Sequence, residues 1–136
     1  MKIKANAMGF QKPFTVKPSV KKYKLANKML IKVLKMQALF TKADAIKPSD
    51  DHYVDAITDI LESEDQFMDD GMKFLQETFR LNDKQMEVVE SHLTDSNSLA
   101  DYISYVIQRV KGASDQQIEA DEKRTRQERK NQDPKK

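Results

Sequence analysis

Apolar side chains recur along residues 19–44 at the three- and four-residue spacing of an amphipathic helix. Ser19 stands where an N-cap is expected, and Lys47-Pro48 closes the connection because a residue before proline avoids helical angles. The predicted apolar face of this first helix comprises Tyr23, Ala26, Met29, Leu30, Val33, Leu34, Met36 and Phe40. The opposite face comprises Lys21, Lys24, Lys28, Lys32, Lys35 and Lys42.

A second helical pattern follows Pro48, and we expect its helix to start near Ser49 or Asp50. Acidic residues in its first turn agree with the helix dipole. The pattern blurs over residues 64–71, so we expect a break near Asp70-Gly71 and a separate helix beyond it. The apolar positions are Tyr53, Val54, Ile57, Ile60 and Leu61 before the blurred stretch, and Met72, Phe74, Leu75 and Phe79 after it.

Two further helices are predicted by their caps and stripes. Asn82, with Gln85 three residues later, forms a capping-box pattern at the start of the first of them. The last stripe ends at Gly112, a residue suited to a helix C-terminus. Its members are Leu99, Tyr102, Ile103, Val106, Ile107 and Val110.

The two ends of the chain lack such stripes. Residues 1–18 contain two of the four prolines and no helical period, so we expect an extended N-terminal arm with one edge strand at most. Residues 113–136 are almost wholly polar, and we expect a charged, mobile tail whose start at Ser114 to Gln117 resembles a helix cap. The fold class predicted is all-α: a single small domain of four to five amphipathic helices over residues 19–112.

Charge is segregated along the chain although the net charge is only +2. Residues 1–47 carry a balance of +11, residues 48–108 a balance of -12, and residues 109–136 a balance of +3. Blocks of opposite sign pair most simply with each other, within one chain or between copies. The lysine row of the first helix has a second interpretation, nucleic-acid binding, but it lacks the arginines that bind phosphates and bases in a bidentate manner.

Catalytic and metal-binding patterns are absent from the sequence. There is no Cys, and the three glycines lie far apart, so no phosphate-binding loop is expected. A calcium loop beginning at Asp65 would place Asp70 where glycine is needed. His52 and His92 lie in no zinc-binding spacing. We therefore expect no enzyme activity, no cofactor and no metal site.

The layout resembles the tail assembly chaperones of long-tailed bacteriophages and prophages, which are encoded just before the tape measure protein. The resemblance implies a protein that coats the tape measure chain, keeps it soluble, helps recruit tail tube subunits and is absent from the finished tail. It rests on the stretch from Tyr53 to Gly112, with Ala56–Leu61, Phe74-Leu75, Phe79, Leu81, the Leu99–Ile107 stripe and Lys111-Gly112, and on the extended opening Phe14–Ser19.

Protein partners are therefore expected, in the cytoplasm of a bacterial host and without a membrane. A small nucleic-acid-binding regulator is the alternative, and a structural adaptor of another phage or bacterial assembly is a third possibility. We expect the client to bind exposed apolar positions, and copies to associate through the lysine face. The predicted client-binding residues are Met29, Val33, Met36, Phe40, Phe67, Met72 and Phe79. The predicted self-assembly residues are Lys21, Lys24, Lys28, Lys32 and Lys35.

Overall fold

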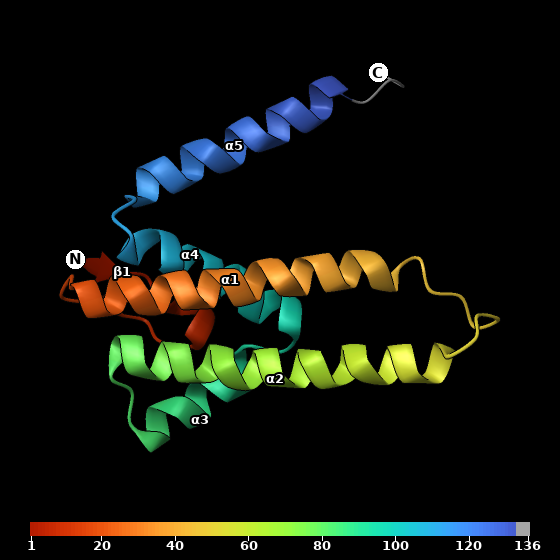
Figure 1. The fold of residues 1–136 in the computed structure, drawn as a ribbon. Coiled ribbons are helices and arrows are strands. Elements are labelled where there is room, and N and C mark those ends of the chain that lie inside the picture. The colour runs from red at the N-terminus through yellow and green to blue at the C-terminus, as the bar shows by residue number, and fades with distance from the viewer. Residues whose placement is uncertain (133–136) are drawn as a thin grey trace.

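The computed structural model describes residues 1–132 and is mostly helical, which confirms the predicted all-α class. Two long helices, α1 and α2, lie side by side and antiparallel, and α4 packs against both of them (Figure 1). The helices are α1 (Val20–Ala43), α2 (Tyr53–Phe79), α3 (Asp83–His92), α4 (Ser96–Val110) and α5 (Asp115–Gln132). Before them come β1 (Lys2–Ile3), the short 3-10 helix η1 (Asn6–Met8) and β2 (Phe14–Thr15).

The predicted helix caps are largely present. The Ser19 side chain accepts a hydrogen bond from the Lys22 backbone N–H at 3.1 Å and begins α1. Asn82 and Gln85 form both hydrogen bonds of a capping box at the start of α3. Gly112 follows α4 with a φ of 105°, a conformation that favours glycine.

The predicted break at Asp70-Gly71 is wrong, because α2 runs unbroken from Tyr53 to Phe79. Gly71 is buried where α2 crosses α4, and a Cβ there would lie 2.6 Å from Ile103 Cδ1 and 3.1 Å from Leu99 Cδ2. The glycine therefore allows two helices to approach closely instead of ending one. The helix also starts later than expected, since His52 has a φ of 63° and precedes the first helical residue.

The N-terminal segment contributes to the core. β1 and β2 pair in an antiparallel ladder, Lys2 opposite Thr15, and the chain between them folds back through η1. The sequence predicted an extended arm with one edge strand at most, whereas the structure has two short paired strands and a segment whose apolar residues are buried. Its buried apolar residues are Ile3, Ala5, Met8 and Val16, each no more than 2% exposed.

Side chains of α4 hold the backbone of this segment in place. The Tyr102 hydroxyl donates to the Lys4 carbonyl at 2.7 Å, and Lys4 N–H donates to the Tyr105 hydroxyl at 3.2 Å. Arg109 Nη2 donates to the Lys2 carbonyl at 2.6 Å. Burial raises the pKa of Tyr102, so its hydroxyl remains a proton donor.

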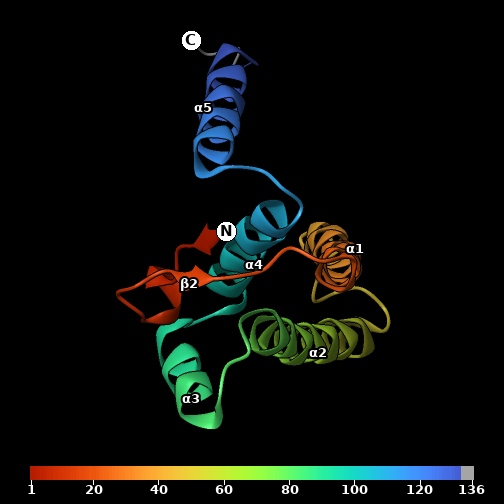
Figure 2. The ribbon, with the colours of Figure 1, turned by 90° about the vertical axis from the view of Figure 1, so that its left-hand side faces the viewer.

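The polar C-terminal segment is helical over α5, which extends away from the other helices (Figure 2). Ser114 and Gln117 cap each other reciprocally, at 3.1 Å and 2.8 Å, as the sequence predicted. Ile118 is 5% exposed, while residues 119–130 are exposed to solvent. The predicted mobility of this tail stays a prediction, and its last four residues lie outside the described part of the chain.

Candidate interaction surfaces

The helices differ in length, so α4 covers only part of the α1–α2 hairpin. At 1.5 Å per residue, α4 with its 15 residues is about 22 Å long, whereas α1 and α2, with 24 and 27 residues, are about 36 and 40 Å long. The end of the α1–α2 hairpin that carries residues 40–58 therefore projects beyond α4 (Figure 1). Large apolar side chains that remain exposed on the two hairpin helices are Val20, Tyr23, Ile31, Leu34, Val54 and Leu61.

A groove between α1 and α4 has an apolar lining. Its volume is about 380 Å³, and Gln37, Ser104, Gln108 and Lys111 supply its polar groups. Leu34, which is 54% exposed, lies in its wall, and Ile31, on the same helix, is 53% exposed. We call this the client groove, and its apolar lining is formed by Leu30, Val33, Leu34, Ile107 and Ala113.

The structure buries most of the residues predicted to bind a client. Phe40 and Met72 are half-buried. The others lie in the core of the chain itself, so the expectation that they are exposed is wrong; they belong to α1 and α2, which pack against each other and against α4. These buried residues are Met29, Val33, Met36, Phe67 and Phe79, none more than 7% exposed. Of the seven, only Val33 also lines the client groove.

All five predicted self-assembly lysines are exposed. Lys32 Nζ lies 3.0 Å from Asp70 Oδ2, so it joins α1 to α2. The hydrogen bond from Lys32 lowers the pKa of Asp70, against a smaller opposing effect of burial. Within residues 1–132, the other four make no ion pair: Lys21, Lys24, Lys28 and Lys35.

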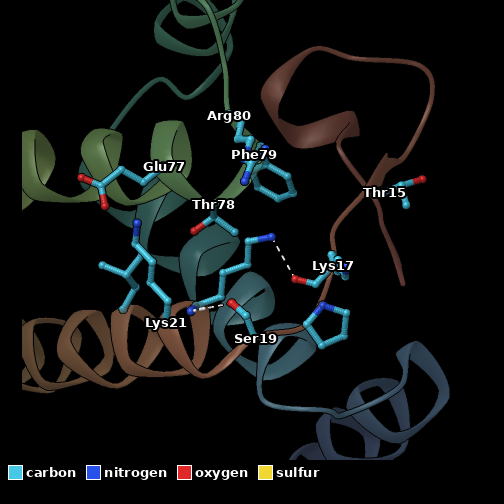
Figure 3. Close-up of a pocket in the computed structure, with 11 residues that line it drawn as sticks. Thr15, Lys17, Ser19, Lys21, Glu77, Thr78, Phe79 and Arg80 are labelled. Carbon is cyan, nitrogen blue, oxygen red and sulfur yellow. Dashed lines mark hydrogen bonds between the residues drawn. The ribbon is translucent and has the colours of Figure 1, made fainter.

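A cleft of about 720 Å³ lies where the start of α1 meets the end of α2 and the chain after β2 (Figure 3). Its lining includes four cationic side chains and one acid, Glu77. Lys22 Nζ donates to the Lys17 carbonyl at 2.8 Å, which fixes one cation. We call this the basic cleft: its cations are Lys17, Lys21, Lys22 and Arg80, and its apolar wall is formed by Pro18, Leu25 and Phe79. The lysine pattern of α1 predicted part of this positive charge. Arg80 was not predicted, because it follows α2 and joins the cleft only through the packing of α2 against α1.

Thr78, also in the lining of the basic cleft, is 3% exposed, and its hydroxyl makes no hydrogen bond within residues 1–132. A buried hydroxyl without a partner destabilises the folded state. Thr78→Val replaces it with a methyl group of similar shape, so we expect the free energy of unfolding to rise by about 1 kcal/mol. Urea denaturation followed by circular dichroism measures this. Thr58→Val, on the exposed surface of the same helix, is the control and should change little.

The family model for phage tail assembly chaperone proteins matches residues 1–128. The fold is that of a small, mostly helical protein, and the family match gives its class. The chain belongs to the phage tail assembly chaperone family, which is a non-catalytic assembly family. No curated protein and no solved structure matched the chain. Over residues 1–132, no helix combines the length and apolar character needed to cross a membrane, and no group of three His, Asp or Glu side chains is placed to hold a metal ion.

Proposed function

We propose that this chain binds an apolar helical segment of the tape measure protein in the client groove and keeps that protein soluble until the tail tube forms around it. The observation that carries the proposal is the groove itself, a partly open apolar channel between α1 and α4. Membership of the tail assembly chaperone family supports phage tail proteins as its partners. Recruitment of tail tube subunits, action in the host cytoplasm and absence from the finished tail belong to the same proposal.

The physical basis is helix-in-groove recognition. An amphipathic helix places its apolar side chains into a groove at helical spacing, while its polar face stays in water. Ile31 and Leu34 are each more than half exposed, so a client that covered them would remove apolar surface from water. Full burial of such a side chain contributes about 1.5–3 kcal/mol, so half that range is available from each.

The test is co-expression of the tape measure protein with the chain, followed by measurement of the soluble fraction of the client. Leu34→Asp, in the groove wall, with Ile31→Asp, exposed on the same helix, should lower that soluble fraction at least fivefold, because a client that covered both positions would have to desolvate two carboxylates. Val20→Asp is the matched control: Val20 is 73% exposed at the start of α1, outside the client groove. Equal solubility with the double variant and with wild type would contradict the proposal.

A nucleic-acid-binding regulator is the second candidate, supported by exposed lysines of α1 that make no ion pair within residues 1–132, among them Lys24 and Lys28. Such binding would be dominated by phosphate contacts and would weaken steeply as salt rises. Titration of duplex DNA and of RNA at moderate salt separates the candidates. Micromolar affinity that is lost in the variants Lys24→Glu and Lys28→Glu would favour the second.

A further inference from the structure

We infer that copies of the chain associate head to tail, with the end of one α1–α2 hairpin seated in the basic cleft of the next copy. The hairpin end, here called the acidic tip, comprises residues 44–59. Its charged residues are Asp44, Lys47, Asp50, Asp51, Asp55 and Asp59, five acids against one base, all of them exposed. This inference concerns a different surface from the client groove and does not depend on the identity of the client.

The basic cleft has the complementary composition. Its four cations face one acid, Glu77, and its volume of about 720 Å³ admits several side chains of another chain. Lys17, Lys21 and Arg80 make no ion pair within residues 1–132, so their charges are available to a partner. The buried Thr78 hydroxyl in the same lining also lacks a partner there.

Apolar groups match as well as charges. Val54, in the acidic tip, is 73% exposed, although a valine is usually at least partly buried. The basic cleft offers an apolar wall that includes Leu25 and Phe79. A peptide that carries carboxylates on both sides of one apolar side chain fits this lining. A nucleic-acid backbone presents phosphates but no apolar side chain to contact that wall, and Glu77 repels its phosphates.

The acidic tip of a chain cannot reach its own basic cleft. The cleft lies at the first turn of α1, and the tip begins after its last turn, about 36 Å away along the helix axis. This distance is several times the Debye length of about 8 Å at physiological salt. Any pairing of these two surfaces must therefore join different copies. Because the surfaces differ, the contact is heterologous and can be repeated from copy to copy.

Backbone conformation marks the same two places. Within residues 1–132, the non-glycine residues with positive φ are His52, at 63° in the acidic tip, and Arg80, at 54° in the basic cleft. This left-handed conformation costs about 1–2 kcal/mol in residues other than glycine. Arg80 occupies the C-cap of α2, in a conformation where glycine is ordinarily favoured. Arg80 thus places a charge in the basic cleft at a position that costs backbone energy.

The experiment is sedimentation velocity of the full chain over a range of concentrations at low and high salt. Wild type should form species beyond the dimer at low salt that dissociate as salt rises.

The cleft variant carries Lys17→Glu, Lys21→Glu and Arg80→Glu, and the tip variant carries Asp51→Lys and Asp59→Lys. The cleft variant alone and the tip variant alone should each self-associate with an association constant at least tenfold lower than that of wild type, with unchanged helical circular dichroism. Lys24 and Lys28 belong to the lysine face that the sequence predicted for self-assembly, but they lie outside the cleft, so Lys24→Glu with Lys28→Glu is the charge control and should assemble like wild type.

Mixing the variants gives the decisive result. The cleft variant keeps an intact tip and the tip variant keeps an intact cleft, so an equimolar mixture should form one-to-one dimers and stop there. A wild-type chain that remains monomeric at every concentration would overturn the inference, as would full assembly of either variant alone. If the cleft variant loses DNA binding but assembles normally, the basic cleft is a nucleic-acid site instead.

Discussion

Removal of residues 1–18 should leave a chain that no longer folds. In this segment Ile3 and Met8 are 0% exposed and Val16 is 2% exposed; the segment contacts α3 through η1, and its Lys4 carbonyl accepts a hydrogen bond from Tyr102 of α4. Full burial of each such side chain contributes about 1.5–3 kcal/mol. Their combined loss, about 4–9 kcal/mol, is comparable to the total stability of a small domain, about 5–15 kcal/mol. Circular dichroism of the truncated chain should show loss of cooperative unfolding, and the chain should aggregate.

A truncation of equal length at the other end is the control. Removal of residues 119–136 keeps Asp115, which pairs with Arg109 of α4, and the buried Ile118. It deletes residues of which 119–130 are exposed to solvent. This variant should unfold with nearly the wild-type midpoint. Met8→Ala is the graded version of the first deletion and should cost about 2–5 kcal/mol. If the N-terminal truncation unfolds like the wild type, the segment is a dispensable arm after all.

Gly71→Leu should destabilise the chain by about 3 kcal/mol or more. Even a Cβ at this position overlaps Ile103 Cδ1, and Ile103 is 0% exposed, so it has no free space to move into. Insertion of bulk into a packed core ordinarily costs about 1–3 kcal/mol, and a whole leucine side chain at a helix crossing exceeds that. The expected result is either a large fall in the urea midpoint or separation of α4 from α2.

Two comparisons make this measurement specific. Asp69→Leu introduces the same side chain at an exposed position of α2 and should change stability by less than about 0.5 kcal/mol. Gly71→Ala should lie between the two, because the gain in helix propensity of about 1 kcal/mol opposes the overlap. Similar stability of Gly71→Leu and Asp69→Leu would show that α2 and α4 do not cross closely at this point.

The sequence predicted what depends on local periodicity and on caps. The stripe of α4 is buried as expected, and Ser19 and Asn82 cap their helices. The break at Gly71 was mispredicted because helix propensity is local, whereas the role of this glycine is set by Ile103, a residue distant in sequence. The burial of Met8 was missed for a related reason, since its segment lacks any periodic pattern of its own.

The interaction surfaces were harder to predict than the helices. An apolar stripe in a sequence does not say which part of it another helix covers. Here Met29 is buried in the core, whereas Leu34 lies in the wall of the groove between α1 and α4 and is exposed, although both belong to the predicted apolar face of α1. The basic cleft depends on the same information, because Arg80 approaches Lys17 and Lys21 only after α1 and α2 have paired.

The Tyr105 hydroxyl connects the N-terminal segment to the start of α5. Tyr105 accepts from the Lys4 N–H and donates to Asp115 Oδ1 at 2.8 Å, while Arg109 Nε lies 3.1 Å from the same carboxylate oxygen. Lys4, which follows β1, and the first turn of α5 thus share an anchoring point on α4. A protein fused to the N-terminus would disturb the contacts among Lys4, Tyr105 and Asp115 that hold the start of α5. Reporter or affinity fusions are therefore better placed behind α5, where the helix surface is open to solvent.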